Sequence, residues 1–476
     1  MKNLKFRHLL AGGVLGLALS FNAIYAQAND QANVSVLKAT QKIDRNGVRL
    51  PYTVLRSDML DGLKPNQNME VRNGGFGSAM TAHPTVANQF YALTDRGPNA
   101  KYSTKAYGKG KIFPTPDYTP RIGLFELQQD GSVKLVKTIL LRRPDGTRIT
   151  GLPNSSALGG TGETPYHNDG SPILKNGEKP FNNDASSPDY NPIRKDDYGL
   201  DGEGLVAVSD GTFWVSDEYG PHMVHFDSEG KEIERINAFR ADKRCKVNLP
   251  AEFANRRPNR GMEGLAITPD EKTLVGIMQS TMRNPNKSVQ KLDATRIVTI
   301  DPQTGAVSQF LYKQEKTANS NSEIVAVSPT KFLVIERDGK FLNKDAKAQK
   351  HVYLIDLSTG TDLEKVSGNG LKQDEKLGLL INGMTVEQAV QKGGWEMLEA
   401  AGIKPVSKKL VVDMVKEVGY PHDKMEGLWL INETTLGVLN DDDFASWSTK
   451  GKLHQKMLND TMIDGNTLYI VDIKLD

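Results

Sequence analysis

The chain has 476 residues, with 60 Lys and Arg against 58 Asp and Glu, and it contains one cysteine. This even charge balance gives no reason to expect nucleic acid or an anionic membrane as a partner, and a single cysteine excludes an intrachain disulfide. A chain of this length can bury a core large enough to be stable without disulfide bonds.

The first residues have the pattern of a secretory signal peptide. A basic segment precedes an uncharged apolar stretch at residues 9–24, and an Ala-Gln-Ala sequence follows. This pattern predicts a cleavable signal peptide over residues 1–26 and a periplasmic or secreted mature chain, residues 27–476, that forms a single domain. No later apolar run approaches the ~18 residues that a spanning helix needs, so we expect no integral membrane segment in the mature chain.

A hairpin-rich unit recurs along the chain. Each unit has a short β-rich run, a turn, a second run and a polar or acidic cluster, and the units begin at Gly77, Glu203, Glu263, Glu323 and Glu426. A second hairpin with an Asp-Gly, Glu-Gly or Thr-Gly turn follows most of them. Four strands per unit predict an all-β fold, a β-propeller of five four-stranded blades, or of six if residues 33–60 form more than one strand.

The ring also has to close. The last unit ends with residues 467–476 and lacks an outermost strand, so we expect the early stretch 33–43 to complete it. Residues 151–200 interrupt the repeats with a polar segment rich in Pro, Gly, Asn and Asp. A loop this long in a compact fold is usually functional, and we expect it on the channel-mouth side as a wall or lid.

A second insertion, residues 370–422, has helical patterns. Thr385 and Gln388 form a capping-box sequence for a helix that ends near Ala401. The spacing of apolar residues after Ser407 predicts a second helix. We expect this helical pair to cover the same mouth of the channel.

A glutamate opens four of the units, namely Glu203, Glu263, Glu323 and Glu426, and the first three are spaced 60 residues apart. In a propeller the first strand of every blade lines the central channel, so residues at one point of successive first strands share a level. We therefore expect these glutamates to converge at one mouth. Asp217 and Asp441, in the acidic clusters that end second strands, would surround it. Carboxylates packed this way repel one another unless protons or cations neutralise them.

Two interpretations of the repeated glutamate stay open. Its carboxylate could accept backbone N–H bonds from the neighbouring blade as a structural device. Alternatively, most of the four could bind a metal ion or a cationic substrate. The first unit has Gly77-Ser78 at this point and still resembles a blade, which favours the second interpretation.

The donor types indicate a hard cation. No histidines stand at HxxxH or HExxH spacing, which disfavours zinc, whereas carboxylates with added carbonyls and waters suit Ca²⁺ better than Mg²⁺. We predict that Ca²⁺ is held by Glu203, Glu263, Glu323, Glu426 and Asp441. Among the acids, we predict catalytic roles for Glu263, Glu203 and Asp217.

Arginines accompany the acids. Arg96 and Arg337 follow acidic residues directly, and Arg257 and Arg260 lie just before Glu263. Because an arginine fork pairs with phosphate or carboxylate oxygens, we predict that these four bind an anionic small molecule, most simply a phosphate ester. The alternative is that each arginine only neutralises a neighbouring acid.

From about Gly74 to its C-terminus the sequence resembles the phytase-like family of exported bacterial proteins, described as having esterase-like activity of phytase. The resemblance rests on GGFGSAM, FYALTDRGPN, DGEGL, FWVSDEYGP, RRPNRGMEGLA, the Ser-Glu-Ile of residues 322–324 and the MEGL of residues 425–428. It implies a β-propeller and a phosphoesterase activity. Alkaline phytases are also propellers, with calcium ions in an acidic channel, but no motif here allows residue-by-residue transfer from them.

Three functions therefore compete. The first is a calcium-dependent phosphoesterase, the second a propeller lactonase or carboxyl esterase, and the third a non-catalytic propeller that binds an envelope component or a protein. A neutral lactone needs no arginine cluster, and a pure scaffold needs no concentration of acids at one mouth. Both features favour the first function.

Overall fold

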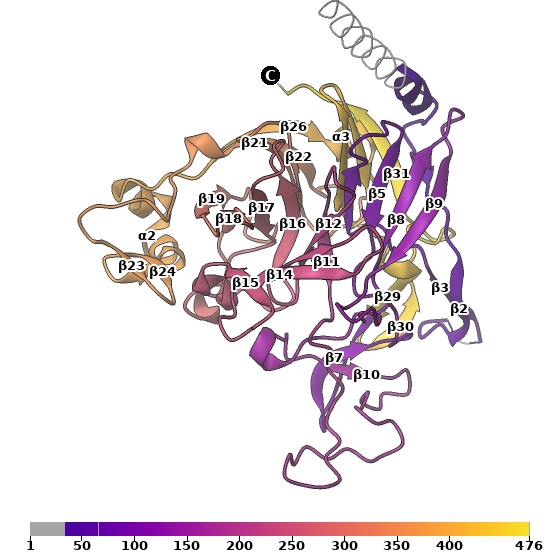
Figure 1. Ribbon diagram of the computed structural model, residues 1–476. Helices are drawn as coiled ribbons and strands as arrows, with labels where there is room; N and C mark the ends of the chain where they lie inside the picture. Colours follow the sequence, from indigo (N-terminus) through magenta and orange to yellow (C-terminus); the bar gives the residue numbers. More distant parts are fainter. Residues whose placement is uncertain (1–33, 65, 476) are drawn as a thin grey trace, which may run out of the picture.

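The computed structural model describes residues 34–64 and 66–475 (Figure 1). The chain is built mostly from β-strands, as the repeated hairpin pattern predicted. The predicted signal peptide, residues 1–26, lies outside the described residues. Within the described part of the chain, no helix is both long enough and apolar enough to cross a membrane.

Five antiparallel sheets follow one another along the chain. The first contains β4 (Ala79–Ala82), β5 (Gln89–Leu93), β8 (Arg121–Leu127) and β9 (Val133–Leu140). The second contains β11 (Gly202–Ala207), β12 (Phe213–Asp217), β13 (His222–Phe226) and β14 (Glu232–Asn237), and β15 (Cys245–Asn248) joins it in parallel. The third contains β16 (Met262–Ile267), β17 (Leu274–Met278), β18 (Ala294–Ile300) and β19 (Val307–Lys313).

The fourth and fifth sheets take strands from more distant segments. The fourth contains β20 (Ser320–Ala326), β21 (Lys331–Arg337), β22 (Lys350–Asp356) and β26 (Ser407–Asp413). The fifth contains β27 (Gly427–Asn432), β28 (Thr435–Leu439), β31 (Thr467–Asp472) and β1 (Val48–Arg49). The first strands contact one another in the order β4, β11, β16, β20, β27 and back to β4.

The hydrophobic core lies between neighbouring sheets. Trp214 of the second sheet packs with Leu265 of the third, and Phe90 of the first packs on Trp429 of the fifth, with ring centroids 4.9 Å apart. Further clusters join the remaining neighbours in the same way. Because successive side chains of a strand point to opposite faces, burial on both faces explains why the inner strands are almost continuously apolar.

The Glu-Gly pairs of the sequence have a steric reason. A Cβ on Gly264 would lie 2.7 Å from the backbone nitrogen of Ile324, and one on Gly204 would lie 2.6 Å from that of Leu265. Neighbouring first strands thus approach each other closely at these points, and a side chain there would force them apart.

Two predicted elements are wrong. Residues 34–40 form a helix rather than a strand, and β1 completes the fifth sheet by pairing antiparallel with β31. Residues 407–413 form strand β26, which pairs with β22, and only α3 (Met414–Val418) is helical. The backbone groups at the open edge of β22 need partners, and the β-branched pair Val411-Val412 suits a strand.

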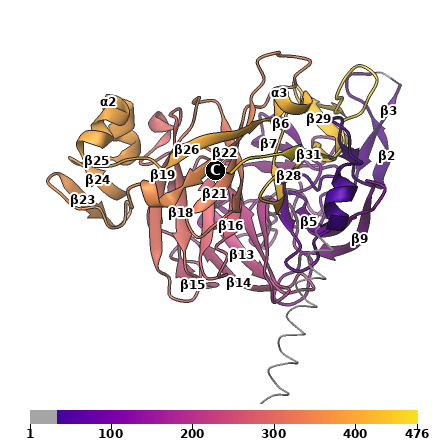
Figure 2. The ribbon, with the colours of Figure 1, turned by 90° about the horizontal axis from the view of Figure 1, so that it is seen from above.

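The predicted helix of the second insertion is confirmed as α2 (Val386–Ala400), with both hydrogen bonds of the Thr385–Gln388 capping box present. Its position differs from the prediction. With β23 (Leu371–Asp374), β24 (Gly378–Ile381) and β25 (Met384–Thr385) it packs against β18 and β19 at the periphery (Figures 1 and 2). Val390 and Leu398 cover Leu311 there, so burial of the apolar stripe decides where the helix lies.

Smaller elements surround the five sheets. In the first insertion, β10 (Thr164–Tyr166) pairs in parallel with β7 (Gly108–Ile112), which pairs with β6 (Ala100–Thr104). Two-stranded sheets are formed by β2 (Val54–Leu60) with β3 (Asn68–Arg72), and by β29 (Ser446–Thr449) with β30 (Lys452–Gln455). Short 3-10 turns lie at Ser156–Leu158, Ala251–Asn255, Lys287–Val289, Leu357–Thr359 and Asp443–Ala445.

Candidate functional site

The strand register brings two sets of polar residues to one end of the sheets. The first strands begin, and the second strands end, at this end. In each first strand, the residue just before the uninterrupted pairing with the second strand occupies an equivalent position; these residues are Ser78, Glu203, Glu263, Ser322 and Glu426. Two residues beyond the corresponding partners in the second strands stand Asp95, Glu218, Gln279, Arg337 and Asp441.

Members of the two sets contact each other. The Nε2 of Gln279 donates to Oε1 of Glu263 over 2.5 Å and lies 3.2 Å from Glu218. The guanidinium of Arg337 pairs with Glu426. Electrostatic interactions link Glu203 and Glu263 to each other and to Glu426, so these three sequence-predicted residues lie in one polar cluster at this end of the sheets.

Glu323 differs from the other three glutamates. β-bulges leave Glu203 and Glu263 as the extra residues of their strands, but in β20 the bulged residue is Ser322. Glu323 therefore stands one position further along, despite the 60-residue spacing, and its carboxylate accepts the backbone N–H groups of Met80 (3.3 Å) and Ile324 (3.0 Å). This geometry matches the structural alternative and does not fit the predicted metal ligand.

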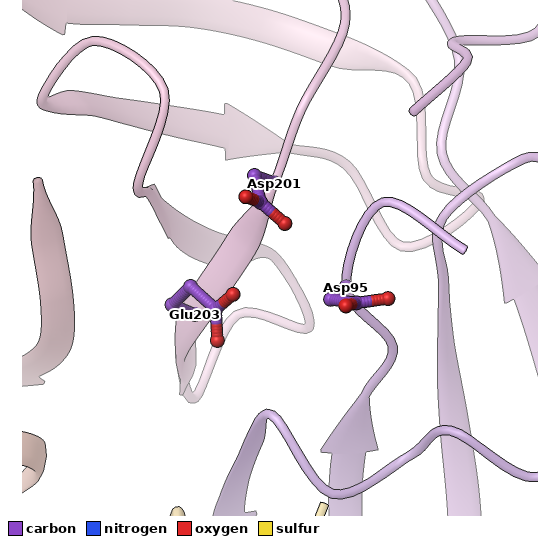
Figure 3. A group of neighbouring side chains, drawn as sticks. All are labelled: Asp95, Asp201 and Glu203. Atoms are coloured by element: carbon purple, nitrogen blue, oxygen red, sulfur yellow. The ribbon is translucent and has the colours of Figure 1, made fainter. Parts of the chain in front are cut away.

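The tightest group of acids combines one predicted and two unpredicted residues. Asp95, Asp201 and Glu203 are buried, and each offers an oxygen within 4.8 Å of the others. Figure 3 shows Asp201 and Glu203 on β11 and the segment before it, facing Asp95 in the segment that follows β5. We call these residues the acidic trio. The Asp-Gly-Glu sequence at 201–203 is the local signal that could have identified Asp201.

Burial and mutual repulsion act on these carboxyls. Burial raises the pKa of Glu203 well above its usual range, and the neighbouring Glu263 and Asp201 raise it further. Burial also raises the pKa of Asp95 well above its usual range, and the neighbouring Asp441 and Asp201 raise it further. Burial, followed by Glu426, raises the pKa of Glu263 to about 8. These groups ionise together only if a cation joins them.

Several carboxylate oxygens here have no partner in the described part of the chain. Oε2 of Glu263 is buried without a hydrogen bond, and no basic side chain lies within 4.0 Å of Asp95, Glu203 or Glu263 among residues 34–64 and 66–475. Leaving buried carboxylates unpaired costs free energy, so the donor set fits a bound cation. Oxygen ligands without histidine or cysteine suit Ca²⁺.

Arg96 and Arg337 form ion pairs with neighbouring acids, which agrees with the alternative that these arginines only neutralise acids of the protein. Arg96 is buried, forms ion pairs with Asp201 and with Glu163 (3.3 Å) of the first insertion, and donates to Asn259 over 2.6 Å. Arg337 pairs with Glu426 and donates to Ser322. Their predicted role in substrate binding does not fit these contacts, because both guanidiniums are committed inside the protein.

Arg257 and Arg260 are placed differently. Both are half-buried, and Arg260 donates to the hydroxyl of Ser320 over 3.1 Å, while the Arg257 side chain contacts no acid within 4.0 Å among the described residues. Burial lowers the pKa of Arg257, and the nearby cations Arg260 and Arg283 lower it further. Because Arg260 and Arg283 donate to the neutral side chains of Ser320 and Gln290, the positive charge of this group favours a bound anion.

The structure places Asp217 outside the acidic trio. Its carboxylate accepts the backbone N–H groups of Asp201 (2.8 Å) and Gly220 (3.0 Å), and burial raises its pKa to about 7. It precedes Glu218 by one position and so lies on the opposite face of the strand. Asp217 thus holds the segment that carries Asp201, and its catalytic role stays a prediction.

Asp441 also has a partner that the sequence did not reveal. The ammonium of Lys424 lies 2.5 Å from Asp441, 2.9 Å from Asp443 and 3.8 Å from Glu426. Although burial opposes its charge, Asp441 and Asp443 raise the pKa of Lys424 well above its usual value. Lys424 therefore stays protonated beside these acids.

Comparison with known proteins gives one family and one partial relative. Residues 71–444 match the family described as Phytase-like: Esterase-like activity of phytase. An "Uncharacterized secreted protein" of Arthroderma benhamiae is 30% identical over 279 residues, 50% of this chain and 52% of that protein. The chain thus matches about half the length of this relative.

Solved structures resemble the chain only weakly. A protein from Lactobacillus plantarum is 10% identical, with 85% of this chain and 92% of that chain covered and a TM-score of 0.30. The PQQ-bound aldose sugar dehydrogenase of Streptomyces coelicolor is 9% identical, with coverages of 89% and 98% and a TM-score of 0.28. Similarities this weak carry no argument about function.

Proposed function

The chain belongs to the phytase-like family, and we propose that it is an exported, calcium-dependent hydrolase of phosphate esters built on a five-bladed propeller. The sheets would be the blades, with the acidic trio at one mouth of the central channel. The apolar N-terminal segment of the sequence and the secreted relative support export.

One observation carries the proposal. Asp201 pairs with Arg96, but Asp95, Glu203 and Glu263 have no basic side chain within 4.0 Å in the described part of the chain, so most of this buried negative charge is not offset. A scaffold gains nothing from such a group, whereas a site for a divalent cation requires it. The half-buried Arg257 and Arg260 beside it favour an anionic ester over a neutral lactone.

The residues divide the chemistry among them. Asp95, Asp201 and Glu203 would hold Ca²⁺, which when bound would polarise a phosphoryl oxygen and lower the pKa of a water. Glu263, with a pKa of about 8, can accept and return a proton at neutral pH. Arg257 and Arg260 would orient the non-bridging oxygens of the substrate, and Asp217 would keep Asp201 in place through its backbone N–H.

Removal of the metal provides the direct test. The purified protein is expected to contain calcium and to hydrolyse phosphate esters in a panel that includes monoesters, diesters, phytate and lactones. Exhaustive EDTA treatment should reduce this turnover by about 100-fold or more, because the charge stabilisation of the metal is lost, and added Ca²⁺ should restore it.

The panel also separates the alternatives. Phosphate-ester turnover that survives EDTA would reject the calcium mechanism. Hydrolysis of lactones alone would support a propeller lactonase. A protein that binds calcium but turns over nothing in the panel would be a binding propeller.

Glu323 provides a test of the structural role assigned to it. Glu323→Gln should leave calcium content and kcat unchanged and lower the free energy of unfolding by about 1–3 kcal/mol, because one backbone N–H loses its acceptor. Denaturant unfolding and metal analysis measure the two effects. Loss of calcium without loss of stability would instead make Glu323 a ligand.

A further inference from the structure

We propose that the ammonium group of Lys424 takes the place of a second metal ion, so that the acidic mouth binds one divalent cation per chain. The inference rests on the proposed function, since it concerns the same site. It divides the acids into two halves: the acidic trio, which binds the ion, and a lysine-filled half formed by Glu426, Asp441 and Asp443.

Nearly every carboxylate oxygen of the lysine-filled half has a partner inside the protein. Oδ2 of Asp441 contacts Lys424 over 2.5 Å, and its Oδ1 accepts the backbone N–H of Asp443 over 2.8 Å. Oδ1 of Asp443 contacts Lys424 over 2.9 Å. Glu426 gives one oxygen to Arg337, and its other oxygen faces Lys424 at 3.8 Å.

A second buried lysine fixes this arrangement from behind. The ammonium of Lys456, 1% exposed, lies 2.6 Å from Oδ2 of Asp443 and 2.9 Å from Asp423. Asp443 is therefore held between two ammonium groups, and neither of its oxygens remains for a metal ion.

The acidic trio has the opposite character. Asp95 and Glu203 have no basic side chain within 4.0 Å in the described ranges, and neither has Glu263, whose buried Oε2 lacks a hydrogen bond. Within the trio Asp201 alone has a basic partner among the described residues, namely Arg96, so most of the acids on this side lack a cation, whereas those of the other side contact Lys424, Lys456 or Arg337. The predicted metal ligand Asp441 becomes a partner of Lys424.

This division has a chemical consequence. Two-metal phosphoesterases stabilise both the attacking and the leaving oxygen with ions about 3.5–4 Å apart. Lys424 is 24% exposed, so its ammonium can also donate to a substrate oxygen while it offsets the acids. It carries one positive charge and cannot lower the pKa of a bound water as a metal does, so a single ion would activate the nucleophile.

Calcium stoichiometry tests the inference without reference to turnover. Equilibrium dialysis of the full chain against Ca²⁺, with metal analysis, should give one ion per chain for the wild type and two for Lys424→Met, which frees the oxygens of Asp441 and Asp443. The matched control is Lys416→Met, because Lys416 is 82% exposed and, among the described residues, forms an ion pair with Asp413 alone; it should keep one ion.

A second pair of variants covers the case in which Lys424→Met does not fold. Asp95→Asn should lose the single ion, whereas Asp441→Asn should retain it. A wild type with two ions, a folded Lys424→Met with one, or loss of the ion in Asp441→Asn would overturn the inference. A chain that binds one ion but hydrolyses no ester would contradict the proposed function alone, and a chain that binds none would overturn both.

Discussion

Replacement of Glu203 by glutamine is expected to remove the bound calcium and to lower kcat for a phosphate ester by about 100-fold or more. The change preserves the shape of the side chain but removes one of the three negative charges of the acidic trio. Since no basic residue within 4.0 Å competes for Glu203 in the described part of the chain, the loss falls on the cation. Metal analysis and initial-rate kinetics measure the two effects.

A matched control separates this effect from a general loss of charge. Glu433 is exposed in the turn after β27, so Glu433→Gln should keep both calcium and kcat. In the apo protein, Glu203→Gln should increase stability, because it relieves repulsion by Glu263 and Asp201. Retention of full calcium content by Glu203→Gln would show that the ion lies elsewhere.

The stability of the calcium-free protein is expected to fall as the pH rises from about 5 to about 8. Burial raises the pKa of Asp217 to about 7, and burial with neighbouring acids raises those of Glu263 and Asp442 to about 8. The folded chain therefore holds protons that the unfolded chain has released above pH ~4, and ionisation of these groups destabilises the folded state up to their folded pKa values.

Calcium should reverse this trend. Its ligands must be deprotonated, so saturating Ca²⁺ should raise Tm more at pH 8 than at pH 5, with a difference of several degrees, about 4 °C or more. Thermal unfolding with EDTA and with Ca²⁺ across this pH range measures both trends. Mg²⁺ at the same concentration is the control, because its smaller octahedral shell suits the trio less well. A calcium-free protein whose Tm rises steadily to pH 8 would contradict the protonation of these buried carboxyls.

Local sequence patterns predicted the positions of many strands and of one helix. Hairpin turns and apolar alternation located the inner strands of every sheet, and the Thr385–Gln388 capping box located α2. Both signals are local, since turn and cap geometry depend on a few consecutive residues. The recurrence of glutamate at the first strands likewise pointed to the end of the sheets where Glu203, Glu263 and Glu426 lie.

Only the tertiary structure decided the role of each acid. Asp217 and Glu218 are adjacent in sequence, yet strand alternation turns the first toward backbone N–H groups and the second toward Arg96. In β20 the bulged residue is Ser322 rather than the glutamate, so the carboxylate of Glu323 accepts backbone N–H groups instead of joining the polar cluster of Glu203, Glu263 and Glu426. Asp95, Asp201 and Lys424 lie far apart in the chain, and what a carboxylate does depends on which cation or N–H group reaches it in space. The sequence supplies the residue types at this end of the sheets, but packing between the sheets determines their partners.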